Sequence, residues 1–126
     1  MLALFLVVRL EGSSNAGLVQ LHANGRWNVI CNYPWDIKAA SVVCRQLGFT
    51  YAASAYDVYL SAEKTVNIYE KIIRCFGNES SIFQCAHTER RTTDRLDGYF
   101  RPSASLCFKG TYNSIRFSFS SPNIVN

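Results

Sequence analysis

Residues 34–49 read PWDIKAASVVCRQLGF, the pattern of one amphipathic helix with defined ends. Asp36 is a good N-cap, because its carboxylate can accept hydrogen bonds from the N–H groups of the first turn. Trp35 precedes this cap and could pack on Ala40 as a hydrophobic staple. Gly48 is a typical stop signal. The stretch therefore predicts a helix of about three turns, whose apolar face is formed by Ala39, Ala40, Val43, Cys44 and Leu47.

The chain as a whole has the composition of one globular domain. It contains 126 residues, of which 48% are hydrophobic and 17% are charged, and this balance argues against disorder. There are five cysteines but no C-x-x-C pair, and the only histidines are His22 and His87, so a structural zinc site or a thioredoxin-like site is not indicated. Widely spaced cysteines favour disulfides and an oxidising compartment; the alternative is buried thiols in a cytosolic protein.

The sequence shows no signature of an enzyme. It has no phosphate-binding loop, no G-x-S-x-G and no H-E-x-x-H motif. The net charge of +4 is too small to indicate nucleic acid as the physiological partner. Basic residues gather in one segment, in which acidic residues partly offset them, and this segment is either a site for anionic ligands or a solvated loop. Its leading members are Arg90, Arg91, Arg95 and Arg101.

Alternation of apolar and polar residues predicts several strands around the helix. Residues 17–21 and 26–31 read as two strands joined by a turn at Asn24-Gly25, a good hairpin pair. The remaining expectations are one or two strands within 51–73, a polar loop at 76–81, an irregular arginine-rich segment at 87–103, and a closing strand at 106–108.

The helix stretch resembles the signature of the scavenger receptor cysteine-rich (SRCR) domain, in which W-D-x-x-D-A-x-V-V-C-R-Q-L-G-F is typical. The resemblance continues in the family's order on both sides of it, at residues 8–14, 17–31, 74–85 and Cys107. It covers residues 8 to about 108. The fold that it implies is α+β, a curved antiparallel sheet cradling one α-helix and stabilised by disulfides.

Three segments are expected. Residues 1–7 are an apolar leader or the remnant of a signal, too short to span a membrane, so direct membrane insertion is not expected. Residues 8–109 form the SRCR domain. Residues 110–126 are a tail in which 115–117 echoes 8–10, and this tail is either a frayed end or the start of a second, truncated repeat.

Five cysteines allow at most two bridges within the chain, and the sequence alone does not choose the pairing. The family resemblance implies the pairs Cys44–Cys107 and Cys75–Cys85. The family partner of Cys31 has no counterpart here, which leaves Cys31 outside any bridge within the chain. Cys31 is then either a buried thiol or the link to another chain by an intermolecular disulfide.

Many family members bind calcium through acidic residues, several of which are replaced here. Asn32, Tyr33 and Arg101 occupy such positions, and calcium prefers several hard, negatively charged oxygen ligands. We therefore expect no metal at the first family site and no cofactor. Asp36 and Glu79 survive, and we interpret them as a helix cap and a loop carboxylate.

The resemblance implies an extracellular ligand-binding module, secreted or in a receptor ectodomain, that recognises proteins or polyanionic and microbial surfaces. The arginine-rich segment is the candidate site for anionic ligands. Two alternatives are a non-catalytic module of an extracellular enzyme, such as a protease or an amine oxidase, and a structural or matrix protein crosslinked through Cys31. Asn78-Glu79-Ser80 is an acceptor triplet for N-glycosylation.

Overall fold

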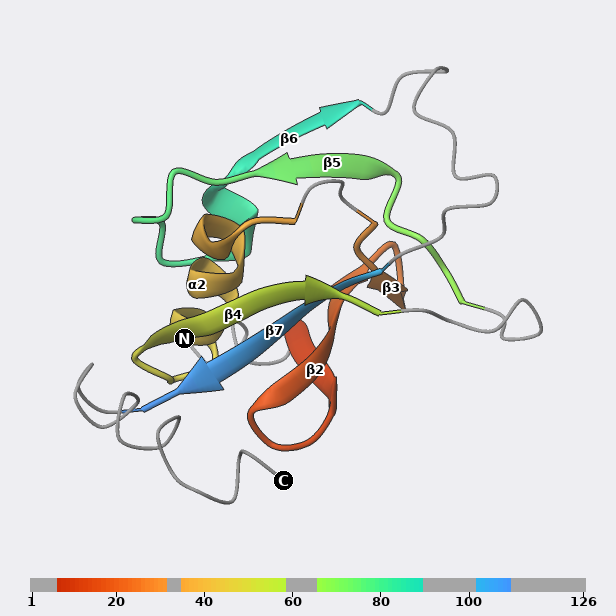
Figure 1. Cartoon of the computed structure of the whole chain (residues 1–126). Helices are drawn as coiled ribbons and strands as arrows, with labels where there is room; N and C mark the ends of the chain where they lie inside the picture. Colours follow the sequence, from red (N-terminus) through yellow and green to blue (C-terminus); the bar gives the residue numbers. More distant parts are fainter. Residues whose placement is uncertain (1–6, 32–34, 59–65, 90–101, 110–126) are drawn as a thin grey trace.

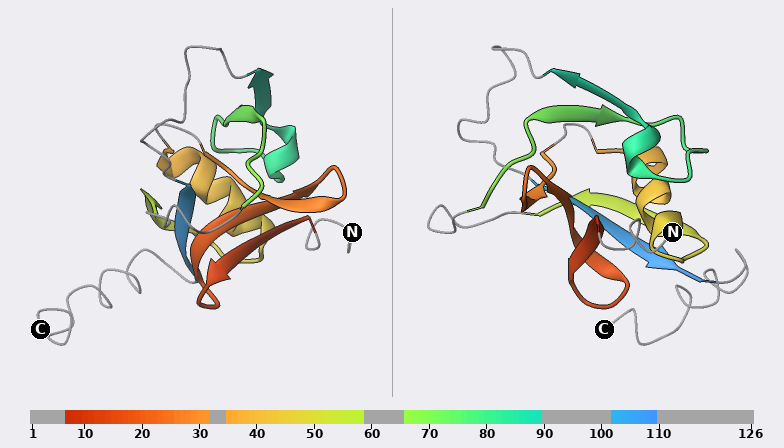
Figure 2. Two further views of the ribbon diagram at one scale, coloured as in Figure 1. Left: turned by 90° about the vertical axis from the view of Figure 1, so that its right-hand side faces the viewer. Right: turned by 180° about the vertical axis from the view of Figure 1, so that it is seen from behind.

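The computed structural model describes residues 7–31, 35–58, 66–89 and 102–109. A five-stranded antiparallel sheet has the order β1-β2-β7-β4, with β3 also paired to β2, and β5 and β6 form a separate pair. Helix α2 lies between the two (Figures 1 and 2). The elements are β1 (Val8–Gly12), β2 (Ala16–Ala23), β3 (Arg26–Val29), α2 (Ile37–Gln46), β4 (Tyr51–Asp57), β5 (Lys71–Arg74), η1 (Ile82–Gln84), β6 (Ala86–Glu89) and β7 (Ser103–Phe108). The α+β fold expected from the sequence is confirmed.

Helix α2 begins and ends at the predicted residues. Asp36 Oδ1 accepts a hydrogen bond from the amide of Ala39 at 3.0 Å, so it is the N-cap. At the other end Gly48 has φ +96°, a conformation that favours glycine, and its amide bonds Arg45 O at 3.0 Å. The buried face is wider than predicted, because Val42 and Gln46 are buried as well.

Most of the predicted strands are present in the structure. The turn between β2 and β3 has positive φ at both Asn24 (56°) and Gly25 (78°), as a tight two-residue hairpin requires. The region 51–73 contains β4 and the start of β5, and the closing strand β7 is longer than expected. One prediction is wrong. The irregular segment expected at 87–103 begins with strand residues, because β6 pairs in register with β5 and so satisfies its backbone groups.

The hydrophobic core lies between α2 and the large sheet, and it extends to η1. The side chains of Val43, Cys44 and Cys107 are fully buried there. Two polar contacts join the layers: Trp35 Nε1 donates to the carbonyl of Ala104 in β7 at 2.9 Å, and Ile82 N donates to Gln46 Oε1 at 2.8 Å. Within the described ranges, no helix is long and apolar enough to cross a membrane.

Both disulfides join the pairs that the family resemblance implies. Cys44 of α2 is bonded to Cys107 of β7 across 63 residues of chain, and Cys75 is bonded to Cys85 across 10. The fifth cysteine, Cys31, lies outside both bridges and is only 5% exposed. A thiol buried to this extent favours the first of the two interpretations, a core cysteine, over a link to another chain.

Candidate functional site

The arginine-rich segment connects two strands whose ends are well anchored. Arg90, Arg91, Arg95 and Arg101 themselves lie outside the described residues. The preceding strand β6 is paired with β5 up to the pair Lys71 and Glu89, whose side chains also form an exposed ion pair at 3.8 Å. After the segment, the backbones of residues 102 and 103 are hydrogen-bonded to residues 58 and 30. The residues on both sides of the segment are therefore held by hydrogen bonds to the rest of the fold.

A second cationic group, which the sequence analysis missed, lies on the sheet. The guanidinium carbon of Arg9 lies 4.0 Å from the centre of the Trp27 ring, and the rings of His22 and Trp27 form a T-shaped pair whose centres are 5.1 Å apart. Arg9 Nε donates to Gln20 Oε1, and Gln20 Nε2 donates to Glu11 Oε1 at 3.2 Å. Predicting this group would have required the register of the paired strands, which sets Arg9 opposite Gln20 and His22 opposite Trp27.

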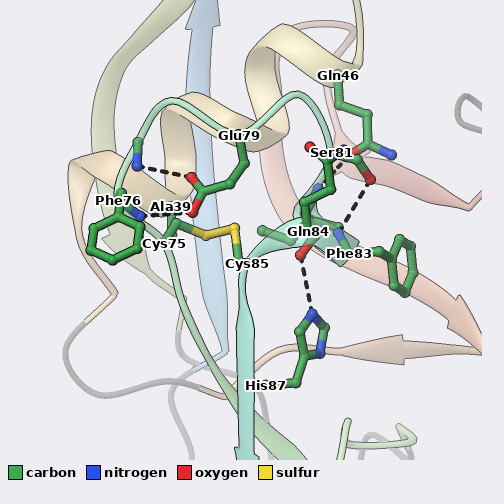
Figure 3. The surroundings of a disulfide bond; sticks show 12 residues. Ala39, Gln46, Cys75, Phe76, Glu79, Ser81, Phe83, Gln84, Cys85 and His87 are labelled. Carbon is green, nitrogen blue, oxygen red and sulfur yellow. Dashed lines mark hydrogen bonds between the residues drawn. A yellow bond between two sulfur atoms is a disulfide. The ribbon is translucent and has the colours of Figure 1, made fainter.

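The loop closed by Cys75–Cys85 is held by a carboxylate at its centre (Figure 3). The two oxygens of Glu79 accept from the amides of Phe76 and Gly77, each at 3.0 Å. Arg45 Nη2 of α2 donates to the carbonyls of Gly77 and Glu79, at 2.6 and 2.8 Å. The backbone bond from Phe76 is the main cause that holds the pKa of Glu79 below its usual range, and the nearby Arg45 adds to it.

Because the folded protein lowers the pKa of Glu79, its ionised form stabilises the fold at neutral pH and this contribution disappears in acid. We expect the Glu79→Gln variant to be less stable than the parent at neutral pH, and the difference to shrink as the pH falls below the usual pKa of a glutamate, about 4.3, and through the lower pKa that Glu79 has in the folded protein. Urea unfolding of both proteins from pH 7 to pH 3 measures this. A difference that is constant over that range would contradict the assignment.

The described histidine nearest this loop is committed to structural bonds. The two ring nitrogens of His87 lie 2.8 Å from the hydroxyl of Tyr69 and 3.1 Å from the carbonyl of Ile82. Since a carbonyl only accepts, Nε2 is the donor and Nδ1 accepts from the phenol. Burial, and then the neighbouring Glu70 and Glu89, raise the pKa of Tyr69. With both ring nitrogens bonded, His87 is not available as a base to activate a nucleophile.

The sequence pattern of the scavenger receptor cysteine-rich domain matches residues 10–98, which is more than half of the chain. The chain belongs to the SRCR family. Similar proteins include the macrophage scavenger receptor types I and II of Mus musculus, 40% identical over 62% of this chain and 18% of that protein. Lysyl oxidase homolog 2 of Bos taurus is 41% identical over 63% of this chain and 10% of that protein.

Solved structures agree with this family. The third SRCR domain of murine neurotrypsin has a TM-score of 0.65 and 26% identity, over 82% of this chain and 97% of that chain. The chain thus spans a whole SRCR domain, but less than a fifth of the length of the two relatives above. SRCR domains are generally non-catalytic modules that occur in extracellular proteins and receptor ectodomains, as the resemblance implies for this chain.

The acidic residues that survive in this SRCR domain have the local roles predicted for them. Asp36 caps α2 and Glu79 organises the disulfide loop, so each carboxylate already accepts backbone hydrogen bonds. The ligand-type atoms of Cys75, Glu79 and Cys85 lie within 4.8 Å of one another, but both sulfurs are in the disulfide and provide no thiolate. Asn32, Tyr33 and Arg101 lie outside the described residues, so the expected loss of the first calcium site stays a prediction.

Proposed function

We propose that this SRCR domain is an extracellular ligand-binding module that binds polyanionic surfaces through its arginine-rich segment. The observation that carries the proposal is the gathering of Arg90, Arg91, Arg95 and Arg101 in the connection between β6 and β7. The similarity to the macrophage scavenger receptor types I and II supports the same conclusion. A protein ligand with an acidic surface would satisfy the same chemistry.

Arginine suits this role because its planar guanidinium matches the geometry of sulfate, phosphate and carboxylate groups. The two strands that flank the segment are paired within the fold, β6 with β5 and β7 with β4, so the segment is tethered at both ends. Exposed charges are screened over about 8–10 Å at physiological salt, so binding through them falls as salt rises. Glu89, Asp94 and Asp97 oppose this field, and the affinity should be modest.

Replacement of all four arginines by serine is expected to weaken binding to heparin or dextran sulfate by at least about fourfold, because exposed charge pairs contribute ~0.2–1 kcal/mol each. The measurement is the salt concentration at which each protein elutes from a heparin column. The control variant replaces four other cations by serine and so has the same net charge as the first variant. These cations are Arg26, Lys38, Lys71 and Arg74. Equal elution of the two variants would show that net charge, and not this segment, binds the polymer.

The match to lysyl oxidase homolog 2 favours a second candidate, a non-catalytic module of an extracellular enzyme. The full-length transcript distinguishes the two: a catalytic domain beside residues 8–109 supports the module, while further SRCR repeats support the receptor. The third candidate, a crosslinked matrix protein, needs an accessible Cys31, and its 5% exposure argues against this. Non-reducing electrophoresis of the secreted protein would reveal a crosslinked dimer.

A further inference from the structure

An exposed aromatic side chain lies beside the glycosylation triplet. Phe76 is 86% exposed, nearly twice the value of Ile37 at 45%, the next most exposed large hydrophobic residue of the described surface. Figure 3 shows its ring pointing away from the Cys75–Cys85 disulfide. Asn78, two residues later, is exposed, and its side chain makes no hydrogen bond to the described part of the protein. The ring therefore offers an exposed apolar surface to a group attached to the Asn78 amide.

The loop presents these two side chains on a rigid backbone. Glu79 binds the amides of Phe76 and Gly77, Arg45 binds two carbonyls of the same turn, and the disulfide closes the loop. Gly77, with φ +111°, has no side chain that could stand between its neighbours. The Cα atoms of Phe76 and Asn78 are at most about 7 Å apart, since two residues span no more. A group attached to Asn78 therefore lies within reach of the ring.

We propose that Asn78 carries an N-linked oligosaccharide and that its innermost N-acetylglucosamine packs on the ring of Phe76. One face of such a sugar carries only C–H groups, and these are attracted to the negative face of an aromatic ring. The contact also removes apolar surface of both partners from water. Because the loop backbone is already ordered, little further entropy is lost when the sugar settles on the ring.

The covalent step uses the lipid-linked oligosaccharide pyrophosphate of the secretory pathway as donor. The Asn78 Nδ2 atom attacks the anomeric carbon of the first sugar, the N–C bond forms, and the bond from that carbon to the pyrophosphate oxygen breaks. Nδ2 loses one proton, the lipid pyrophosphate leaves with the bonding pair, and nothing is oxidised or reduced. In the folded loop Ser80 Oγ donates to Gln84 Oε1 at 2.8 Å, so the triplet's hydroxyl is engaged. Transfer before the loop closes leaves this hydroxyl available to the transferase.

The test uses the full chain secreted from animal cells behind a cleavable leader. Enzymatic deglycosylation in ¹⁸O-water followed by mass spectrometry measures how much of Asn78 is occupied, with Asn78→Gln as the unoccupied control. Phe76→Ser keeps the triplet and removes the ring, Phe76→Tyr restores a ring, and Ile37→Ser is a matched change at another exposed apolar residue. All variants except Asn78→Gln are expected to be occupied.

Two readouts report the contact itself. In the parent, Ile37→Ser and Phe76→Tyr, the glycan is expected to raise the Tm by a few degrees, and the ring current should move first-sugar proton resonances upfield. Both effects should vanish in Phe76→Ser. An unoccupied Asn78 in the secreted parent overturns the proposal. An occupied Asn78 with the same Tm gain and the same chemical shifts in Phe76→Ser overturns the contact with the ring.

Discussion

Replacement of both Cys44 and Cys107 by alanine is expected to lower the free energy of unfolding by about 4 kcal/mol, because that bridge closes a loop of 63 residues. Closing so long a loop removes many conformations from the unfolded chain. Both cysteines are fully buried, so alanine is a better replacement than serine, whose hydroxyl would need a buried partner. Equilibrium unfolding in urea without reductant measures the change.

The second bridge and the fifth cysteine provide the controls. The Cys75→Ala/Cys85→Ala variant opens a loop of only 10 residues and should lose less, ~2.5–3 kcal/mol on the same entropic argument. The Cys31→Ala variant keeps both bridges, since Cys31 belongs to neither. If the long-loop variant were no less stable than the short-loop variant, strain or residual structure in the unfolded chain, and not loop closure, would dominate.

The second large effect is expected at Trp35, which links the start of α2 to the sheet. Its side chain is 8% exposed, and its indole N–H donates to the carbonyl of Ala104 at 2.9 Å. Trp35→Ala should cost ~3–5 kcal/mol of stability, because it leaves a large cavity in the core. Trp35→Phe retains much of the burial but leaves the fully buried Ala104 without this donor, and should cost ~1–3 kcal/mol.

Unfolding followed by circular dichroism measures both variants, since Trp27 remains as a second fluorophore and would complicate fluorescence. Ile37→Ala is the matched control: it lies two residues further along, is 45% exposed, and should change stability by no more than ~0.5 kcal/mol. A loss below about 1 kcal/mol for Trp35→Ala would mean that the core collapses around the gap, and that the bond to β7 contributes little.

Helix α2 could be predicted almost to the residue because its signals are local. A cap, a stop and a period of 3.6 residues act within a few turns of chain, and no distant segment overrides them here. The turn at Asn24-Gly25 has the same origin, since both residues tolerate positive φ. The cysteine pairing is a different case: the residues alone left it open, and only the family resemblance indicated the two bridges that the structure contains.

Strand β6 and the group around Arg9 escaped prediction because they depend on partners far away in sequence. Residues 86–89 have no strand pattern of their own and are extended because β5 supplies their hydrogen bonds. Arg9 meets Gln20 and Trp27 only through the register of three strands. The arginine-rich segment was found as a cluster of charge, but where its side chains point stays a prediction.

The sequence by itself determined the helix with its caps, the tight hairpin and the membership of the SRCR family, because each is written in residues that lie close together. Only the tertiary structure decided that Trp35 bonds β7, that Cys31 is buried and that Phe76 is left exposed beside Asn78. Burial is a property of what surrounds a residue, and residues from distant parts of the chain supply these surroundings. A fold can therefore be inferred from local signals, while the exposure of its surface groups has to be measured in three dimensions.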